Sequence, residues 1–284
     1  MIPLKDDAPR VTTAYVTYFL IAVNTMIFAL EWVVGVRSPR DWTALITQFG
    51  LVPARITVVL FNQGYVPWDL VYQLGTRYVP PAAAFLPVFT SMFLHGSWMH
   101  LIFNMWTLWI FGDNVEDYLG HFRYIVLYLI SGVAAMAVHT FFNPSSTMPT
   151  VGASGAIAGV MGAYFLLYPR AKVLTLVPFF LIWFMWLPAW IVLGYFFVAQ
   201  FLLGAASSIS VHGGGSAGGV AVWAHVGGFL QEWPWSSSSL PAPAAINSGP
   251  INCRTRFRPR SVPESKKGTL AASAARGTPR SSTR

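Results

Sequence analysis

The sequence predicts an all-α polytopic membrane protein built as a bundle of six transmembrane helices. Hydrophobic residues make up 55% of the 284 residues, charged residues make up 10%, and the mean hydropathy is +0.53. These values lie far from those of soluble domains. The apolar residues also gather in six separate segments, which is typical of a chain that crosses a bilayer several times.

The first apolar segment covers residues 14–34 and follows a short polar stretch, residues 1–13. At 1.5 Å per residue it is about 30 Å long, which is enough to cross the bilayer core. It exceeds the apolar part of a signal peptide and no A-x-A site follows, so we expect an anchored helix. Residues 35–87 are interrupted by several Pro and Gly residues. We expect a long, structured loop at the membrane interface there.

Five further apolar segments follow. Their expected bounds are residues 96–112, 122–142, 154–168, 173–205 and 219–230. Pro178 and Pro188 are expected to kink or shorten the fifth segment. The sixth would be about 18 Å long as a helix, which is too short to cross a core of ~30 Å. The sequence therefore predicts a truncated sixth helix, followed by a basic, Ser/Pro/Arg-rich disordered tail over residues 231–284.

Charge and cysteine content narrow the function classes. The net charge is +8, but residues 1–230 carry nine Lys/Arg against eight Asp/Glu, whereas residues 231–284 carry nine against two. A basic tail beside a bilayer is typical of the cytoplasmic side or of contact with anionic lipid, so we expect no nucleic-acid partner. Cys253 is the only cysteine, which excludes an intrachain disulfide and a cysteine zinc site.

The distribution of basic residues predicts the orientation in the membrane. Lys5 and Arg10 precede the first segment, and Arg170 and Lys172 lie between the fourth and the fifth. The positive-inside rule then places the N-terminus in the cytoplasm. Four arginines in the first loop favour the opposite orientation, but a loop of that length has little influence on topology. The second, fourth and sixth segments would then all run from outside to inside.

Polar residues near the starts of these three segments converge at one depth. His100 lies roughly 6 Å into the second segment, and Asn104 lies one helical turn deeper on the same face. His225 lies roughly 9 Å into the sixth segment. Ser154 begins the fourth segment in the run GASGAIAG, residues 152–159. Counted back from the inner surface at Arg170, it lies roughly 8 Å below the outer surface. Polar side chains at membrane depth favour a functional role.

These residue types can perform nucleophilic catalysis. Ser154 at a helix N-terminus is a candidate nucleophile, and His225 is its candidate base. No carboxylate lies at that depth, since Asp113, Glu116 and Asp117 fall near the inner end of the second segment. A Ser/His dyad rather than a triad is therefore predicted.

Helix packing and metal binding are the competing interpretations of the same residues. Gly155 and Gly159 form a G-x-x-x-G face, beside which the serine could simply pack. His225 could form an interhelical hydrogen bond, and His95 and His100 could be interfacial residues or metal ligands. The order and matched depth of the polar residues together favour catalysis over each of these readings.

The serine run, the run HGSWMHLIFN (residues 95–104) and the run AHVGG (residues 224–228) resemble the rhomboid family of intramembrane serine proteases, bacterial type. The resemblance covers roughly residues 87–230. It implies a six-helix core, a Ser154/His225 dyad that cleaves transmembrane proteins, and no cofactor or metal. It assigns oxyanion or supporting roles to His100, Asn104, Gly152 and His95. It further implies a multi-pass protein of the bacterial plasma membrane.

Three departures from the family pattern stand out. Leu86 and Pro87 lie where many members carry a Trp-Arg pair, and Ala158 replaces an aromatic residue that stacks on the histidine. Glu232 occupies the position of a further glycine, and the long apolar run that usually follows is missing. We hypothesise a frameshift near Leu230, which predicts weak or absent activity. The alternatives are an inactive rhomboid-like protein that binds transmembrane helices, and a channel or transporter, for which no inverted repeat is visible.

Overall fold

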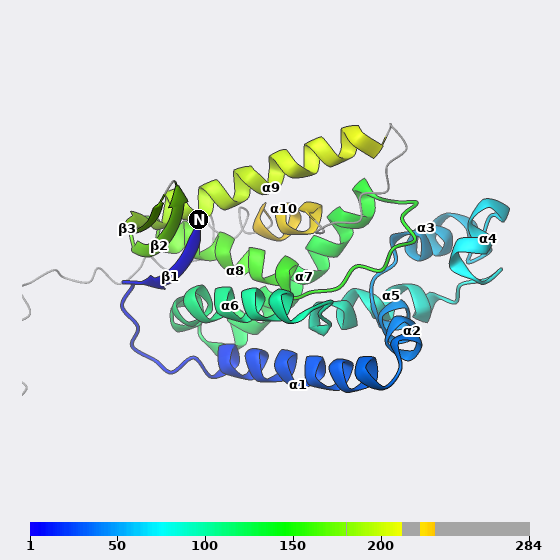
Figure 1. The fold of residues 1–284 in the computed structure, drawn as a ribbon, viewed down its shortest axis with the longest axis horizontal. Coiled ribbons are helices and arrows are strands. Elements are labelled where there is room, and N and C mark those ends of the chain that lie inside the picture. Colours follow the sequence, from blue (N-terminus) through cyan, green and yellow to red (C-terminus); the bar gives the residue numbers. More distant parts are fainter. Residues whose placement is uncertain (180, 212–221, 231–284) are drawn as a thin grey trace, which may run out of the picture. The chain divides into compact units, whose positions relative to one another are not determined.

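The computed structural model describes residues 1–179, 181–211 and 222–230, all of which belong to one unit, Met1–Pro243. Most of this part of the chain is helical (Figure 1). The predicted tail over residues 231–284 and the first residues of the predicted sixth segment, 219–221, lie outside the described residues.

Four helices lie near the predicted positions of apolar segments. They are α1 (Tyr15–Arg37), α6 (Trp98–Leu119), α7 (His121–Phe142) and α8 (Ser154–Leu167). Helix α6 is longer than the predicted segment 96–112 and ends at Leu119. The next residue, Gly120, has a positive φ of 77°, which permits the sharp turn into α7. Helix α8 packs against α6, α7 and α10 (Val222–Leu230), so its small residues lie at the centre of the helical core.

The long first loop carries four short helices and one 3-10 turn. These are α2 (Pro39–Phe49), α3 (Pro53–Asn62), α4 (Trp68–Leu74), α5 (Pro81–Thr90) and η1 (Ser91–Phe93). Proline starts α2, α3 and α5, where its missing N–H and fixed φ suit the first helical turn. The prolines that excluded a transmembrane span therefore define where these helices begin.

The prediction of a single apolar helix over residues 173–205 is wrong in its first half. Two antiparallel strands pair there, β2 (Lys172–Phe179) and β3 (Leu181–Pro188), and α9 (Ala189–Val211) is helical. The N-terminal strand β1 (Ile2–Asp6) pairs with β2, giving the strand order β1-β2-β3. Hydropathy cannot separate an apolar strand from an apolar helix, whereas Pro178 disfavours the helix. The fold is thus helical with one small sheet, not all-α.

Two of the described helices are long and apolar enough to cross a membrane, namely α1 and α7. Helix α8 and residues 189–203 of α9 are apolar but shorter. Within the described residues, the length and composition of the helices therefore support two membrane spans. The predicted six spans are a proposal.

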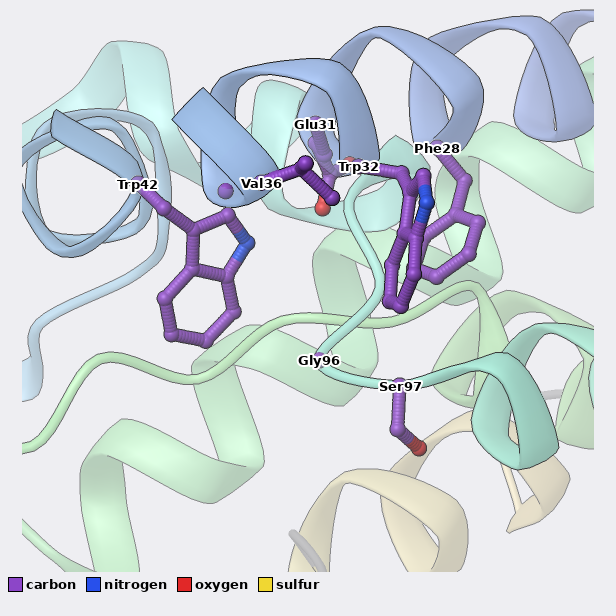
Figure 2. Close-up of a pocket in the computed structure, with 8 residues that line it drawn as sticks. Phe28, Glu31, Trp32, Val36, Trp42, Gly96 and Ser97 are labelled. Carbon is purple, nitrogen blue, oxygen red and sulfur yellow. The ribbon is translucent and has the colours of Figure 1, made fainter. Parts of the chain in front are cut away.

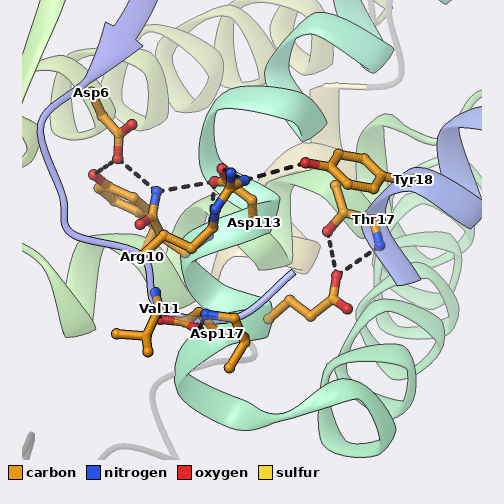
Figure 3. Close-up of polar contacts among 11 residues, drawn as sticks. Asp6, Arg10, Val11, Thr17, Tyr18, Asp113 and Asp117 are labelled. Atoms are coloured by element: carbon orange, nitrogen blue, oxygen red, sulfur yellow. Dashed lines mark hydrogen bonds and ion pairs between the residues drawn. The ribbon is translucent and has the colours of Figure 1, made fainter. Parts of the chain in front are cut away.

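A polar network ties the N-terminus to the end of α6. The Glu116 carboxylate accepts the backbone N–H groups of Val16 and Thr17 at 2.8 and 2.7 Å, at the start of α1, and lies 2.6 Å from His121 Nδ1. Asp117 likewise accepts the backbone N–H of Val11 at 3.0 Å (Figure 3). Carboxylates at a helix N-terminus satisfy donors that the helix leaves unpaired. This network fixes the position of α1 against α6.

Strand β1 is anchored through Asp6. Its carboxylate accepts hydrogen bonds from Tyr164 Oη at 2.6 Å and from Asn114 Nδ2 at 2.8 Å, while Arg10 forms an ion pair with Asp113 at 2.8 Å (Figure 3). Burial raises the pKa of the Asp6 carboxyl, and the hydrogen bond from Tyr164 only partly opposes this rise. The three acidic residues near the end of α6 are thus engaged in holding the N-terminal segment.

Candidate active site

A cavity of about 840 Å³ lies between α6, the loop over residues 143–151, α8, α9 and α10. Its polar lining includes two serines, three histidines, two asparagines and a glutamine, namely Ser146, Ser154, His100, His139, His225, Asn104, Asn143 and Gln200. Among the described residues that line it there is no Asp or Glu. The three histidines are therefore the candidate bases among these lining residues.

Ser154 is the first residue of α8, and Gly152 positions it against α6. Gly152 has a φ of 133°, and its N–H donates to Ser91 O at 2.8 Å. A Cβ at Gly152 would lie 2.7 Å from both Cε1 and Nε2 of His100, and 3.6 Å from Ser154 Oγ. By the sum of these two distances, the His100 ring lies within about 6.3 Å of Ser154 Oγ. Both the backbone conformation and the space at this position require glycine.

His225 is held by a glutamine that the sequence analysis did not identify. The imidazole is 7% exposed, and its Nδ1 lies 3.0 Å from Oε1 of Gln200 on α9. With the Gln200 oxygen as the acceptor, this contact requires the tautomer that carries its proton on Nδ1 and leaves the lone pair on Nε2. Nε2 is buried and has no hydrogen-bond partner among the described residues. In this tautomer Nε2 is the unprotonated nitrogen that a general base requires.

Glycines bring α10 close to α8 and α7. A Cβ at Gly228 would lie 2.0 Å from Gly155 O, and a Cβ at Gly227 would lie 2.7 Å from Val138 Cβ. At Gly159 the nearest atom would be Ser131 Oγ. The small face predicted as a packing surface therefore exists, and it is the surface that carries His225 toward the start of α8. The packing and the catalytic interpretations of the serine run are compatible.

His100 and Asn104 both line the cavity, one turn apart on α6, whereas His95 does not. Asn104 is 6% exposed, and its Nδ2 has no hydrogen-bond partner among the described residues. His95 is fully buried behind His100, with the two ring centroids 5.2 Å apart. Four of the six predicted site residues, Ser154, His225, His100 and Asn104, thus line the cavity. Gly152 lies against the His100 ring, and His95 lies behind that ring.

A second polar cluster shapes the loop that leads to Ser154. His139 Nε2 lies 3.0 Å from Thr150 Oγ1, and Asn143 Nδ2 donates to His139 O at 2.9 Å. Thr150 also pairs with Leu51 through two backbone hydrogen bonds. The sequence analysis missed His139, although a histidine near the end of an apolar helix is a signal of this kind. Within the described residues, no group of three or more His, Cys, Asp or Glu is arranged to hold a metal ion.

The Rhomboid domain family model matches residues 82–233, which is more than half of the chain. The chain belongs to the rhomboid family. The matched region contains Ser154, His225 and the four predicted supporting residues, and also Gln200. Rhomboid proteins are integral membrane proteins, so the polar cavity belongs to a membrane protein.

Individual relatives match smaller parts of the chain. RHOMBOID-like protein 6, mitochondrial, of Arabidopsis thaliana is 29% identical over 166 residues, which are 53% of this chain and 50% of that protein. Rhomboid protein 1, mitochondrial, of Saccharomyces cerevisiae is 30% identical over 43% of this chain and 37% of its own. Rhomboid protease GluP of Bacillus subtilis is 39% identical over 26% and 14%. The chain thus spans half or less of the length of these relatives.

Proposed function

We propose that this rhomboid protein is an intramembrane serine endopeptidase that hydrolyses peptide bonds of transmembrane proteins through a Ser154/His225 dyad. The observation that carries the proposal concerns His225: its Nδ1 lies 3.0 Å from Gln200 Oε1, and its buried Nε2, which makes no hydrogen bond to Ser154 Oγ or to another described residue, is available to accept a proton. Ser154 and His225 line the same cavity. The name of the Bacillus subtilis relative, a rhomboid protease, supports the same reaction class.

In the proposed reaction, Ser154 Oγ attacks the carbonyl carbon of the scissile peptide bond while His225 Nε2 takes the hydroxyl proton. Collapse of the tetrahedral intermediate breaks the C–N bond, and the imidazolium returns the proton to the leaving amine. A water molecule then attacks the acyl-enzyme with His225 again acting as base, which releases the carboxylate product and regenerates the serine. Gln200 orients the imidazole by accepting from Nδ1–H both before and after Nε2 takes the proton, and, unlike the carboxylate of a triad, it is neutral.

The oxyanion is stabilised from three sides. The backbone N–H of Ser154 lies at the N-terminus of α8, which favours negative charge. His100 and Asn104 lie across the cavity, and the unpartnered Nδ2 of Asn104 is a buried donor without an acceptor until an oxyanion forms. One such donor contributes about 10²–10³ to kcat. This explains why a polar amide can remain unpaired at this depth.

Substrates are proposed to be single-span proteins whose helices unwind easily near the membrane surface. The cavity is bordered by Phe103 on α6 and by Tyr195 and Phe196 on α9, so an extended peptide would enter between these two helices. We further propose six crossings with the N-terminus in the cytoplasm. The relatives include mitochondrial and bacterial proteins, so they do not support the bacterial plasma membrane over an organelle membrane.

The competing function is a rhomboid-like protein that binds transmembrane helices without cleaving them. The sequence lacks a long apolar run after Leu230, which favours this alternative. Against it, residues 222–230 of α10 hold His225 at the cavity through glycine contacts with α8. The two functions differ in whether Ser154 is required for product formation.

The test is cleavage of a single-span substrate in proteoliposomes by the full chain, beside Ser154→Ala and His225→Ala. Ser146→Ala is the matched control, because this serine lines the same cavity. We expect both dyad variants to be inactive and the control to retain activity. Product formation that persists in Ser154→Ala would refute the protease proposal, and binding of the substrate without any cleavage by the parent chain would favour the alternative.

A further inference from the structure

A second, smaller cavity lies between α1, the start of α2 and the loop before α6. It measures about 240 Å³, against ~30 Å³ for one water in the liquid. Trp42 forms one wall, and Trp32 with Phe28 forms the opposite wall (Figure 2). Gly96 and Ser97 close it from below in this view. The residues that α1 and α2 contribute lie outside the matched region, residues 82–233, whereas Gly96 and Ser97 lie inside it.

The aromatic walls are held rigidly. The rings of Phe28 and Trp32 both make edge contacts with Trp98, at centroid distances of 4.9 and 5.4 Å. Trp42 lies against Gly35, where an added Cβ would be 3.4 Å from Trp42 Cδ1. Two facing aromatic surfaces are therefore fixed before any ligand arrives, which lowers the entropic cost of binding.

The carboxylate of Glu31 lies between these walls and lacks a counter-charge. Glu31 is 1% exposed, and its two oxygens share one donor, the backbone N–H of His95, at 3.3 and 3.2 Å. No Lys, Arg or His side chain forms an ion pair with it among the described residues. A buried carboxyl group with a single shared hydrogen bond is unfavourable as an anion, so it either takes up a proton or pairs with a positive charge. Figure 2 shows its oxygen directed toward the space between Trp42 and Trp32.

We propose that this cavity binds an organic ammonium ion, with the positive charge against Glu31 and the aromatic faces of Trp32, Trp42 and Phe28 around its substituents. Aromatic faces attract cations, and quaternary ammonium groups are recognised by cages of such rings. A carboxylate adds a charge-assisted contact that a purely apolar ligand cannot use. The ligand is either the ammonium headgroup of a lipid or a free ammonium compound.

The site has a structural connection to the candidate active site. Glu31 holds the backbone N–H of His95, and the His95 ring packs on His100, which faces Gly152 and Ser154. The proposal itself concerns binding and does not depend on proteolysis. Its test therefore uses a binding measurement, so that its failure is distinct from a failure of the proposed function.

The experiment titrates the purified full chain in a maltoside detergent with choline and follows tryptophan fluorescence. A parallel titration uses 3,3-dimethylbutanol, in which carbon replaces the charged nitrogen at nearly the same shape. We expect saturable binding of choline and at least tenfold weaker binding of the neutral analogue. Glu31→Gln, which keeps the acceptor for His95, and Trp42→Leu are each expected to weaken choline binding at least tenfold. Trp190→Leu, on an exposed residue of α9, is the control and should leave binding unchanged.

Equal binding of the charged and the neutral compound by the parent chain would overturn the proposal, and so would unchanged choline affinity in both pocket variants. To separate the two sources, the choline titration is repeated in nanodiscs of phosphatidylcholine and of phosphatidylglycerol. Loss of free-choline binding only in phosphatidylcholine would identify the lipid headgroup as the ligand. Equal binding in both would identify a free ammonium compound.

Discussion

A methyl group added at Gly228 tests whether the close approach of α10 and α8 sets the catalytic geometry. In Gly228→Ala the new Cβ would lie 2.0 Å from Gly155 O, and side-chain atoms of this kind essentially never come closer than 3.0 Å. The two helices must therefore separate by about 1 Å at this point. Gly155 directly follows Ser154, and Gly228 lies one turn beyond His225, so the displacement acts on the dyad itself.

The expected consequence is a loss of kcat much larger than the loss of stability. A misplacement of about 1 Å between reacting groups costs roughly 10²-fold in rate, whereas overpacking costs about 1–3 kcal/mol of the free energy of unfolding. The assay is single-span substrate cleavage in proteoliposomes, with kcat and KM determined separately and the thermal unfolding midpoint measured in detergent. We expect kcat to fall about a hundredfold while KM changes little.

Gly194→Ala on α9 is the matched control. A Cβ there meets nothing closer than Phe165 Cε2 at 3.9 Å, an ordinary contact. Both substitutions carry the same gain in helix propensity of about 1 kcal/mol, so their difference isolates the steric effect. If Gly228→Ala retains kcat within threefold of the parent chain, or if both variants lose activity equally, then the close approach of α10 and α8 does not set the geometry of the dyad.

Three further predictions concern the surroundings of the dyad. Gln200→Leu removes the acceptor for His225 Nδ1 and should lower kcat by roughly tenfold to a hundredfold with a similar KM; an unchanged pH–rate profile and kcat would contradict the positioning role. Because burial raises the pKa of Asp6, the folded state holds this proton more tightly than the unfolded state. The free energy of unfolding should therefore fall as the pH rises from the ordinary Asp pKa to the raised one. Asp6→Asn should lack this component in thermal unfolding between pH 4 and pH 7, and an identical slope in both proteins would exclude Asp6 as its source. Replacing the residues after Leu230 with about ten apolar residues should extend the sixth helix to a length that spans the core, raising both the unfolding midpoint and kcat; no change in either would sink the frameshift hypothesis.

The residues that the sequence placed most accurately are those governed by local rules. Depth along an apolar helix follows from a fixed rise per residue, and counting turns was sufficient to predict that Ser154, His100 and Asn104 would line one cavity. The bounds of α7 and α8 agree with the predicted 122–142 and 154–168 to within one residue at each end. Gly152 illustrates the limit: its role depends on the His100 ring 2.7 Å from where a side chain would be, a contact between distant segments.

Features that depend on contacts between distant segments could not be predicted from the sequence. Residues 172–188 are as apolar as a membrane helix, but the N-terminal strand supplies a pairing partner more than 160 positions away, which no local pattern reveals. Gln200 lies within an apolar run, and its significance follows only from the position of His225 on another helix. Glu31 carried a usable signal, because an ionisable residue within a membrane helix is a site hypothesis by default. The aromatic walls around it come from separate helices and needed the structure.

Labelling of the purified full chain by a fluorophosphonate, which reacts with activated serines, tests the Ser154/His225 dyad. We expect label on the parent chain, at Ser154 by peptide mass, its loss in both Ser154→Ala and His225→Ala, and its retention in Ser146→Ala. Label that survives in Ser154→Ala, or no label on either the folded parent chain or the variant with an extended sixth helix, would exclude the dyad.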